Sequence, residues 1–179
     1  MKRRLWLAGA LASASLAFLP SAIAFPEGAL LGHTGGFGEG SCASCHFGGS
    51  QGDDIALRVE GVDVYAPGER YRFFVRVMDA DAAVAGFQLS ARFEDGASAG
   101  QLGAGSGSQT GTLDEVIYAS HSAPQPVEDG EAVWELEWVA PEDAAQPVIL
   151  HAASVSGADD QSPIGDNVLT LELRMEPAE

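Results

Sequence analysis

The residues with the clearest chemistry are Cys42, Cys45 and His46, in the run Cys-Ala-Ser-Cys-His. Two cysteines separated by two residues can add across the two vinyl groups of haem. A histidine directly after the second cysteine can then bind the iron as the proximal ligand. The chain of 179 residues has no other cysteines. The run therefore predicts one covalently attached haem c.

Three other interpretations of this run stay open. A redox dithiol usually opens a helix in a βαβ unit, and this chain shows no such pattern. A zinc site would need further ligands and often has a second pair of cysteines. A structural disulfide between Cys42 and Cys45 would close a very small ring and leave His46 without a role. Haem attachment is the interpretation that uses all three residues.

The second axial position of the iron has several candidate ligands. His121 follows an expected strand and precedes a turn, a position from which a side chain can leave a sheet and reach a cofactor at its edge. His33 lies nine residues before Cys42 in the same glycine-rich stretch. The remaining candidates are His151, Met78 and Met175.

The elements that must position these residues read as strands. Tyr71, Phe73, Val75 and Val77 alternate with polar or larger residues, which is the period of a half-buried strand. Similar runs separated by turn-forming stretches predict strands at 55–60, 68–78, 84–93, 115–120, 132–140, 147–156 and 167–175. About seven short strands without an amphipathic helix indicate an all-β, immunoglobulin-like antiparallel β-sandwich. The residues expected to point inward are Tyr71, Phe73, Phe87, Leu89, Trp134, Leu136, Trp138, Leu150 and Leu171.

Two glycine-rich stretches lack this periodicity. Residues 25–53 predict an irregular segment that can wrap closely around a group and that carries the haem. Residues 96–111 predict a flexible loop. We therefore divide the chain into a leader, 1–24, the haem-attachment segment, 25–53, the sandwich, 54–175, and a tail, 176–179.

The leader reads as a signal peptide. Lys2, Arg3 and Arg4 precede an apolar stretch, and Ala22-Ile23-Ala24 resembles a cleavage site. The apolar stretch is shorter than the roughly 20 residues that a membrane span needs. We expect cleavage near Ala24, a periplasmic or secreted protein, and no stable insertion in a membrane.

The charge of the chain limits its partners. The leader holds three of the nine basic residues and none of the 26 acidic ones, which leaves a formal charge of −20 on the mature chain. Such a surface repels nucleic acid and anionic lipid and favours basic partners or cations. A solvated acidic coat is the alternative explanation.

Several stretches, taken in order, resemble one family. They are "TGGFGEGSCASCHFGG", "YAPGERYRFFVRV", "AGFQLSARFEDG", "YASHSA", "WELEWVAP" and "VILHAASVSGADDQSPIGDNVLTLEL". Together they resemble exported bacterial proteins with a Reeler-like (reelin N-terminal-like) β-sandwich after a Cys-x-x-Cys-His segment. The resemblance spans about residues 32 to 173. It implies a histidine ligand at the place of His121, with His33 as the runner-up. Many of those proteins carry a C-terminal anchoring module, which "RMEPAE" does not resemble.

These observations predict an exported monohaem c-type cytochrome. Cys42 and Cys45 would form the thioethers, His46 would be the proximal ligand and His121 the distal one. Two histidine ligands favour single-electron transfer at a lower potential than a His/Met pair. We expect a redox partner protein, for which the acidic surface favours a basic one, and an electron carrier rather than a catalyst. The alternatives are a haem-based binding or sensing module, and a non-haem adhesion or matrix domain.

Overall fold

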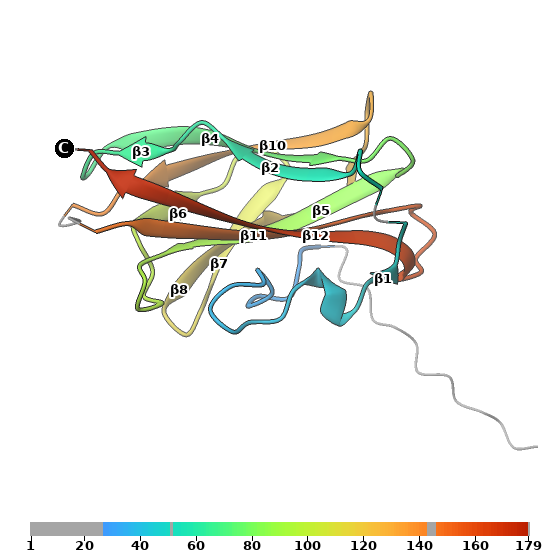
Figure 1. Ribbon diagram of the computed structural model, residues 1–179, viewed down its shortest axis with the longest axis horizontal. Helices are drawn as coiled ribbons and strands as arrows, with labels where there is room; N and C mark the ends of the chain where they lie inside the picture. The colour runs from blue at the N-terminus through green and yellow to red at the C-terminus, as the bar shows by residue number, and fades with distance from the viewer. Residues whose placement is uncertain (1–26, 51, 143–145, 179) are drawn as a thin grey trace, which may run out of the picture.

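The computed structural model describes residues 27–50, 52–142 and 146–178. The expected signal peptide lies outside these residues. Within the described part, twelve strands form two sheets that pack face to face (Figure 1). One 3-10 helical turn lies outside the sheets. The fold is therefore the all-β, immunoglobulin-like sandwich that the strand pattern predicts. No helix of the described residues is both long enough and apolar enough to cross a bilayer.

The smaller sheet has the strand order β2-β4-β10-β6. Its strands are antiparallel, and β4 pairs with β10 over nine residues. The bounds are β2 (Ala56–Glu60), β4 (Arg70–Met78), β6 (Gln101–Gly103) and β10 (Glu131–Val139).

The larger sheet has the order β1-β12-β11-β5-β8-β7, with β3 paired to β12 and β9 paired to β5. The short strands β1 and β3 run parallel to β12, and the other pairs are antiparallel. The bounds are β1 (Phe47–Gly48), β3 (Val64–Tyr65), β5 (Val84–Arg92), β7 (Ser108–Leu113), β8 (Val116–His121), β9 (Gln125–Pro126), β11 (Val148–Gly157) and β12 (Ile164–Pro177).

The core lies between the two sheets. Phe73, Val75 and Val77 are buried on β4, as their alternation predicts. Trp134 and Trp138 on β10 are the largest fully buried side chains. All the residues expected to point inward belong to this core or, for Tyr71 and Leu171, are partly buried against it.

All seven expected strands are present, and the structure adds shorter ones. The stretch 96–111, expected to be a flexible loop, contains β6 and the first part of β7. That expectation was wrong because β6 is hydrogen-bonded through its backbone to β10, and β7 to β8. Backbone hydrogen bonds do not require apolar and polar side chains to alternate. Strand β12 also continues to Pro177, two residues into the expected tail.

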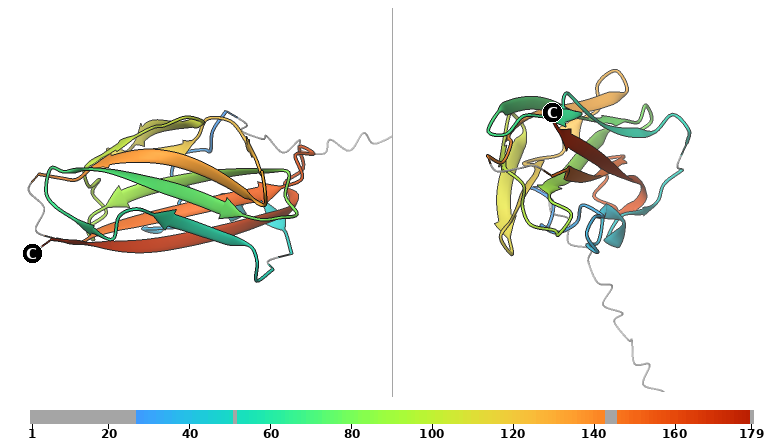
Figure 2. Two further views of the ribbon diagram at one scale, coloured as in Figure 1. Left: turned by 90° about the horizontal axis from the view of Figure 1, so that it is seen from above. Right: turned by 60° about the vertical axis from the view of Figure 1, so that its left-hand side comes forward.

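The larger sheet is covered on both faces. On β5, Phe87 and Leu89 face the core, yet the alternating Gln88, Ser90 and Arg92 are buried as well. The cover on the outer face is the N-terminal segment, drawn in blue and teal in Figure 1, opposite β2, β4 and β10 (Figures 1 and 2). The backbone N–H of His33 donates to Gln88 Oε1 at 2.7 Å, which fixes the segment to the sheet. The segment is therefore a third layer.

Candidate haem-attachment site

The Cys-x-x-Cys-His run forms one helical turn. The 3-10 helix η1 (Cys42–Ser44) begins after Ser41, whose Oγ accepts a hydrogen bond from the Ala43 N–H at 3.3 Å. The N–H groups of Cys45 and His46 both donate to the Cys42 carbonyl, at 3.1 and 2.9 Å. The sequence predicted irregular backbone here. The structure instead has one 3-10 turn, and the backbone of Cys45 and of His46 is hydrogen-bonded to its first residue.

The two thiols are free in the described structure, with Cys45 exposed and Cys42 half-buried. Burial and, to a smaller extent, the neighbouring Cys45 raise the pKa of the Cys42 thiol to about 12, although a hydrogen bond with its own backbone acts in the opposite direction. A redox dithiol needs a thiolate, and hence a lowered pKa. The surroundings of Cys42 therefore speak against the dithiol interpretation.

The side chain of His46 is hydrogen-bonded to that of Asp166 at the start of β12. Its Nδ1 lies 2.6 Å from Asp166 Oδ2. The backbone of β1 aligns the two residues, because the Phe47 N–H donates to the Pro163 carbonyl at 2.9 Å and the Gly49 N–H to the Asp166 carbonyl at 3.1 Å. A carboxylate accepts hydrogen bonds, so Nδ1 carries the hydrogen and the lone pair of Nε2 is left for a metal.

His121 ends β8 and is buried, with 8% of its surface exposed. The Phe87 N–H donates to its Nδ1 at 3.0 Å, which puts the ring hydrogen on Nε2, and the Phe87 carbonyl oxygen lies 3.1 Å from the same Nδ1 as an alternative acceptor. In the tautomer that donates to this carbonyl, Nε2 is left for a metal. The ring lies against Gly86, where a Cβ atom would come within 2.6 Å of Cε1. The glycine makes the space that the imidazole occupies.

His121 lies within electrostatic range of His46. Burial lowers the pKa of His121, the hydrogen bond with the Phe87 backbone acts in the opposite direction, and the charge of His46 lowers the pKa further. The neutral imidazole that this favours is the form that binds a metal.

His33, the runner-up ligand, lies inside the segment beside η1. Its Nδ1 is 3.1 Å from the Leu30 carbonyl oxygen and 3.3 Å from that of Leu31. Because both neighbours are acceptors, Nδ1 donates and Nε2 keeps its lone pair. A Cβ atom at Gly40 would lie 3.6 Å from this Nε2. His33 therefore stays a possible ligand.

The other candidate ligands point elsewhere. His151 Nε2 lies 3.0 Å from Glu172 Oε2, and its ring packs edge-on against Phe37 with centroids 5.1 Å apart. Met175 is fully buried in the core between the sheets, and Met78 lies on β4 of the smaller sheet. Met78 and Met175 therefore lie away from η1, whereas His151 packs against the N-terminal segment with its Nε2 held by Glu172.

A buried polar cluster, which the sequence did not predict, fixes the segment to the sheet. We call Thr34, Glu39, Arg92 and Tyr118 the anchor cluster. Arg92 Nη2 donates to Glu39 Oε1 and, at 2.7 Å, to the Tyr118 hydroxyl. That hydroxyl donates to Glu39 Oε1 at 2.5 Å, and the Thr34 hydroxyl donates to Glu39 Oε2 at 2.8 Å. The ring of Phe37 covers the guanidinium, 5.0 Å from its Cζ.

A zinc-type site has few possible ligands here. Across residues 27–50, 52–142 and 146–178, no three His, Cys, Asp or Glu side chains lie together as a group that could hold a metal ion. A haem iron needs fewer ligands from the protein, since the porphyrin occupies four positions and one or two axial ligands complete the set. The residues of this site fit that smaller requirement.

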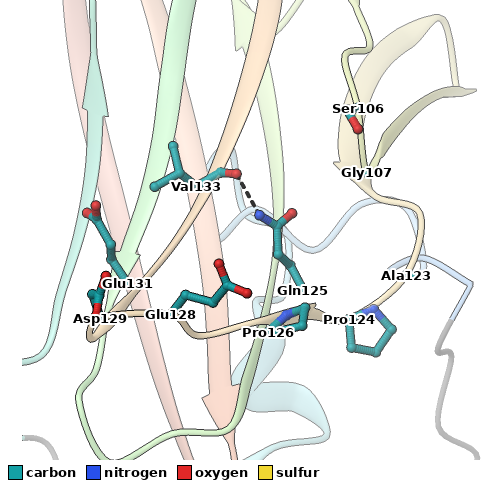
Figure 3. A pocket seen from close by; sticks show the side chains of 10 residues that line it. All are labelled: Ser106, Gly107, Ala123, Pro124, Gln125, Pro126, Glu128, Asp129, Glu131 and Val133. Atoms are coloured by element: carbon teal, nitrogen blue, oxygen red, sulfur yellow. Dashed lines mark hydrogen bonds between the residues drawn. The ribbon is translucent and has the colours of Figure 1, made fainter.

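A polar groove lies apart from these residues (Figure 3). Gln125 Nε2 donates to the Val133 carbonyl there at 2.8 Å. None of the candidate haem ligands lines the groove. Its lining residues are Ser106, Gly107, Ala123, Pro124, Gln125, Pro126, Glu128, Asp129, Glu131 and Val133.

Comparison with known proteins identifies neither a family nor a function for this chain. No protein-family model matches the sequence, and no curated protein does. Among solved structures, the chain is similar to AggA, the major subunit of aggregative adherence fimbriae type I from Escherichia coli, at 12% identity and a TM-score of 0.35. That similarity covers 74% of this chain and 100% of the fimbrial subunit.

Proposed function

We propose that this protein is an exported monohaem c-type cytochrome that transfers single electrons. Cys42 and Cys45 would hold the haem through thioethers, and His46 and His121 would be its axial ligands. The observation that carries this proposal is that both imidazoles are held through Nδ1 and have no hydrogen-bond partner at Nε2 among the described residues. When bound, the haem supplies a one-electron iron couple.

The strand order supports two ligands from opposite sides of one group. His121 lies against Gly86 on β5, whereas His46 is joined to Asp166 on β12. Strand β11 lies between β5 and β12, so the two points of attachment are about 10 Å apart across the sheet.

Two protein ligands would leave the iron without an open position for a substrate. We therefore propose electron transfer rather than catalysis, at a potential below that of a His/Met pair. We also propose that the sandwich is Reeler-like and that the protein is periplasmic or secreted.

The proposed redox partner is a basic protein. Five of the six arginines that follow the leader form ion pairs within the molecule, so their charge is already neutralised. The excess carboxylates dominate the field outside the protein. A basic partner would be attracted, and a nucleic acid would be repelled.

The deciding experiment is production of the full chain together with the haem-attachment machinery. We expect the purified protein to carry the mass of one haem and a low-spin c-type spectrum, and a Cys42→Ala/Cys45→Ala variant to lose both. A wild-type protein without this mass would refute the proposal. If the two thiols were also oxidised to a disulfide, the result would favour an adhesion or matrix domain instead.

The distal ligand is tested by a matched pair of variants. His121→Ala should convert the reduced haem to a form that binds carbon monoxide rapidly, whereas His33→Ala should leave the spectrum unchanged. The reverse pattern would assign the ligand to His33. Rapid binding of carbon monoxide by the wild-type protein would favour the sensing module.

A further inference from the structure

We propose that Asp166 is a positioning residue that fixes the proximal imidazole and lowers the reduction potential of the haem. The inference rests on the proposed function, because it takes His46 to be an iron ligand. It goes further by naming which residue sets the character of that ligand. Asp166 lies 120 residues after His46 in the sequence.

The contact between the two side chains is short and sheltered. Nδ1 and Oδ2 are 2.6 Å apart, and the side chains of His46 and Asp166 are 33% and 10% exposed. A hydrogen bond to a charged acceptor is stronger than one to a neutral carbonyl, and a partly buried one is less weakened by water. The imidazole therefore has one preferred orientation, with Nε2 turned away from Asp166.

Asp166 is itself fixed from two sides. Its backbone pairs with β1, where the Gly49 N–H donates to its carbonyl. Its carboxylate lies against Gly157 at the end of β11, where a Cβ atom would come within 2.0 Å of Oδ1. Gly157 has no positive φ angle, so the need for glycine here is one of space. The carboxylate occupies that space.

The chemical consequence follows from how a ligand's other nitrogen is bound. An acceptor on Nδ1–H draws the proton toward itself and makes Nε2 a stronger donor. A stronger donor stabilises the oxidised iron relative to the reduced iron. A carboxylate does this more strongly than a neutral acceptor does, so Asp166 is expected to hold the potential down.

The test is the reduction potential of three variants, measured by spectroelectrochemistry on the haem-loaded full chain. Asp166→Asn keeps the size of the side chain and removes its charge. Gly157→Ala places a methyl group where the carboxylate lies and so displaces it, while residue 166 remains an aspartate. Asp159→Asn is the control, because this exposed residue near the same end of β12 also loses one negative charge and makes no contact with His46.

We expect Asp166→Asn and Gly157→Ala to shift the potential upward, and Asp159→Asn to shift it much less. Urea midpoints and spectra show whether each variant is folded and low-spin. Folded, haem-loaded Asp166→Asn and Gly157→Ala proteins with the potential of Asp159→Asn would overturn the inference and leave the cytochrome proposal intact. A wild-type protein that binds no haem would instead refute the proposed function.

Discussion

The imidazole of His121 lies against the backbone of Gly86, in the space that a Cβ atom at that position would fill. An alanine there would come within 2.6 Å of the ring, closer than carbon atoms approach without a shift. We therefore expect Gly86→Ala to move His121 and to weaken the bond to the iron that we propose for it. The expected result is a haem-loaded protein with a partly high-spin spectrum and increased binding of carbon monoxide.

The matched control is Gly103→Ala on β6 of the other sheet. A Cβ atom there would meet only Glu137, at 3.3 Å from its Cβ. This variant should keep the wild-type spectrum. If Gly86→Ala also kept it, His121 would not be the ligand that the space around Gly86 suggests.

The anchor cluster should contribute to stability through its buried ion pair. The side chains of Arg92 and Glu39 are 6% and 14% exposed, so Glu39→Gln leaves a buried guanidinium without its carboxylate. Breaking a buried pair in this way costs about 3 kcal/mol or more. Urea unfolding of Glu39→Gln should show this loss, and Glu142→Gln, at an exposed position, should stay within about 0.5 kcal/mol of the wild type.

The double variant Glu39→Gln/Arg92→Met separates the ion pair from the rest of the cluster. Because it removes both charges, it should be more stable than Glu39→Gln alone. Equal or lower stability of the double variant would mean that the ion pair does not account for the loss.

The anchor cluster should also lose stability in acid. Burial raises the pKa of Glu39, but hydrogen bonds from Tyr118, Arg92 and Thr34 outweigh this effect and leave the pKa below its ordinary value of 4.5. A carboxyl whose pKa is lower in the folded state stabilises the fold fully above 4.5, and this contribution disappears as the pH falls through the lowered value. The urea midpoint of Glu39→Gln should therefore fall less in this acid range than that of the wild type. Parallel curves would contradict the assignment.

A second loss of stability is expected at alkaline pH. Burial and the hydrogen bond to Glu39 raise the pKa of Tyr118 from 10.0 to about 12. A phenol whose pKa is raised in the folded state contributes fully below pH 10, and the contribution disappears as the pH rises toward 12. Tyr118→Phe should show less of this alkaline fall in the urea midpoint. The same fall in both proteins would assign it to other groups.

The acidic surface should select redox reagents by charge. A cationic metal complex should exchange electrons with the haem protein faster at low salt, and the rate should fall as salt is added. An anionic complex of similar potential should show the opposite trend under stopped-flow mixing. Similar rates and no salt dependence for both reagents would mean that the carboxylates do not affect access to the haem.

Much of the fold could be predicted because the strands of the core alternate in the sequence. Phe73, Val75 and Val77 on β4 show the period of two directly, and the structure places them in the core. Strands β6 and β7 could not be found in this way, since their glycine-rich and serine-rich sequence has no apolar face. Strand β6 pairs with β10, which is distant in the sequence, whereas β7 forms a hairpin with the adjacent strand β8.

The site was only partly predictable. The Cys-x-x-Cys-His run is local, so Cys42 and His46 could be singled out from their spacing. Asp166 lies in a turn-rich acidic stretch, and nothing local indicates its contact with His46. A weak signal existed on β5, where glycine and small polar residues alternate with apolar ones. That pattern suggested a face exposed to water, whereas the N-terminal segment covers it.

The parallel pairing of β1 with β12 also has a consequence for how the protein is made. The segment that bears the two cysteines leaves the ribosome early, whereas the strand on which it docks is the last in the described sequence. Contacts between such distant parts of a chain form late in folding. On the proposed function, the thiols should therefore stay accessible to a haem-attaching enzyme until the last strand is complete, and completion of that strand would end this period.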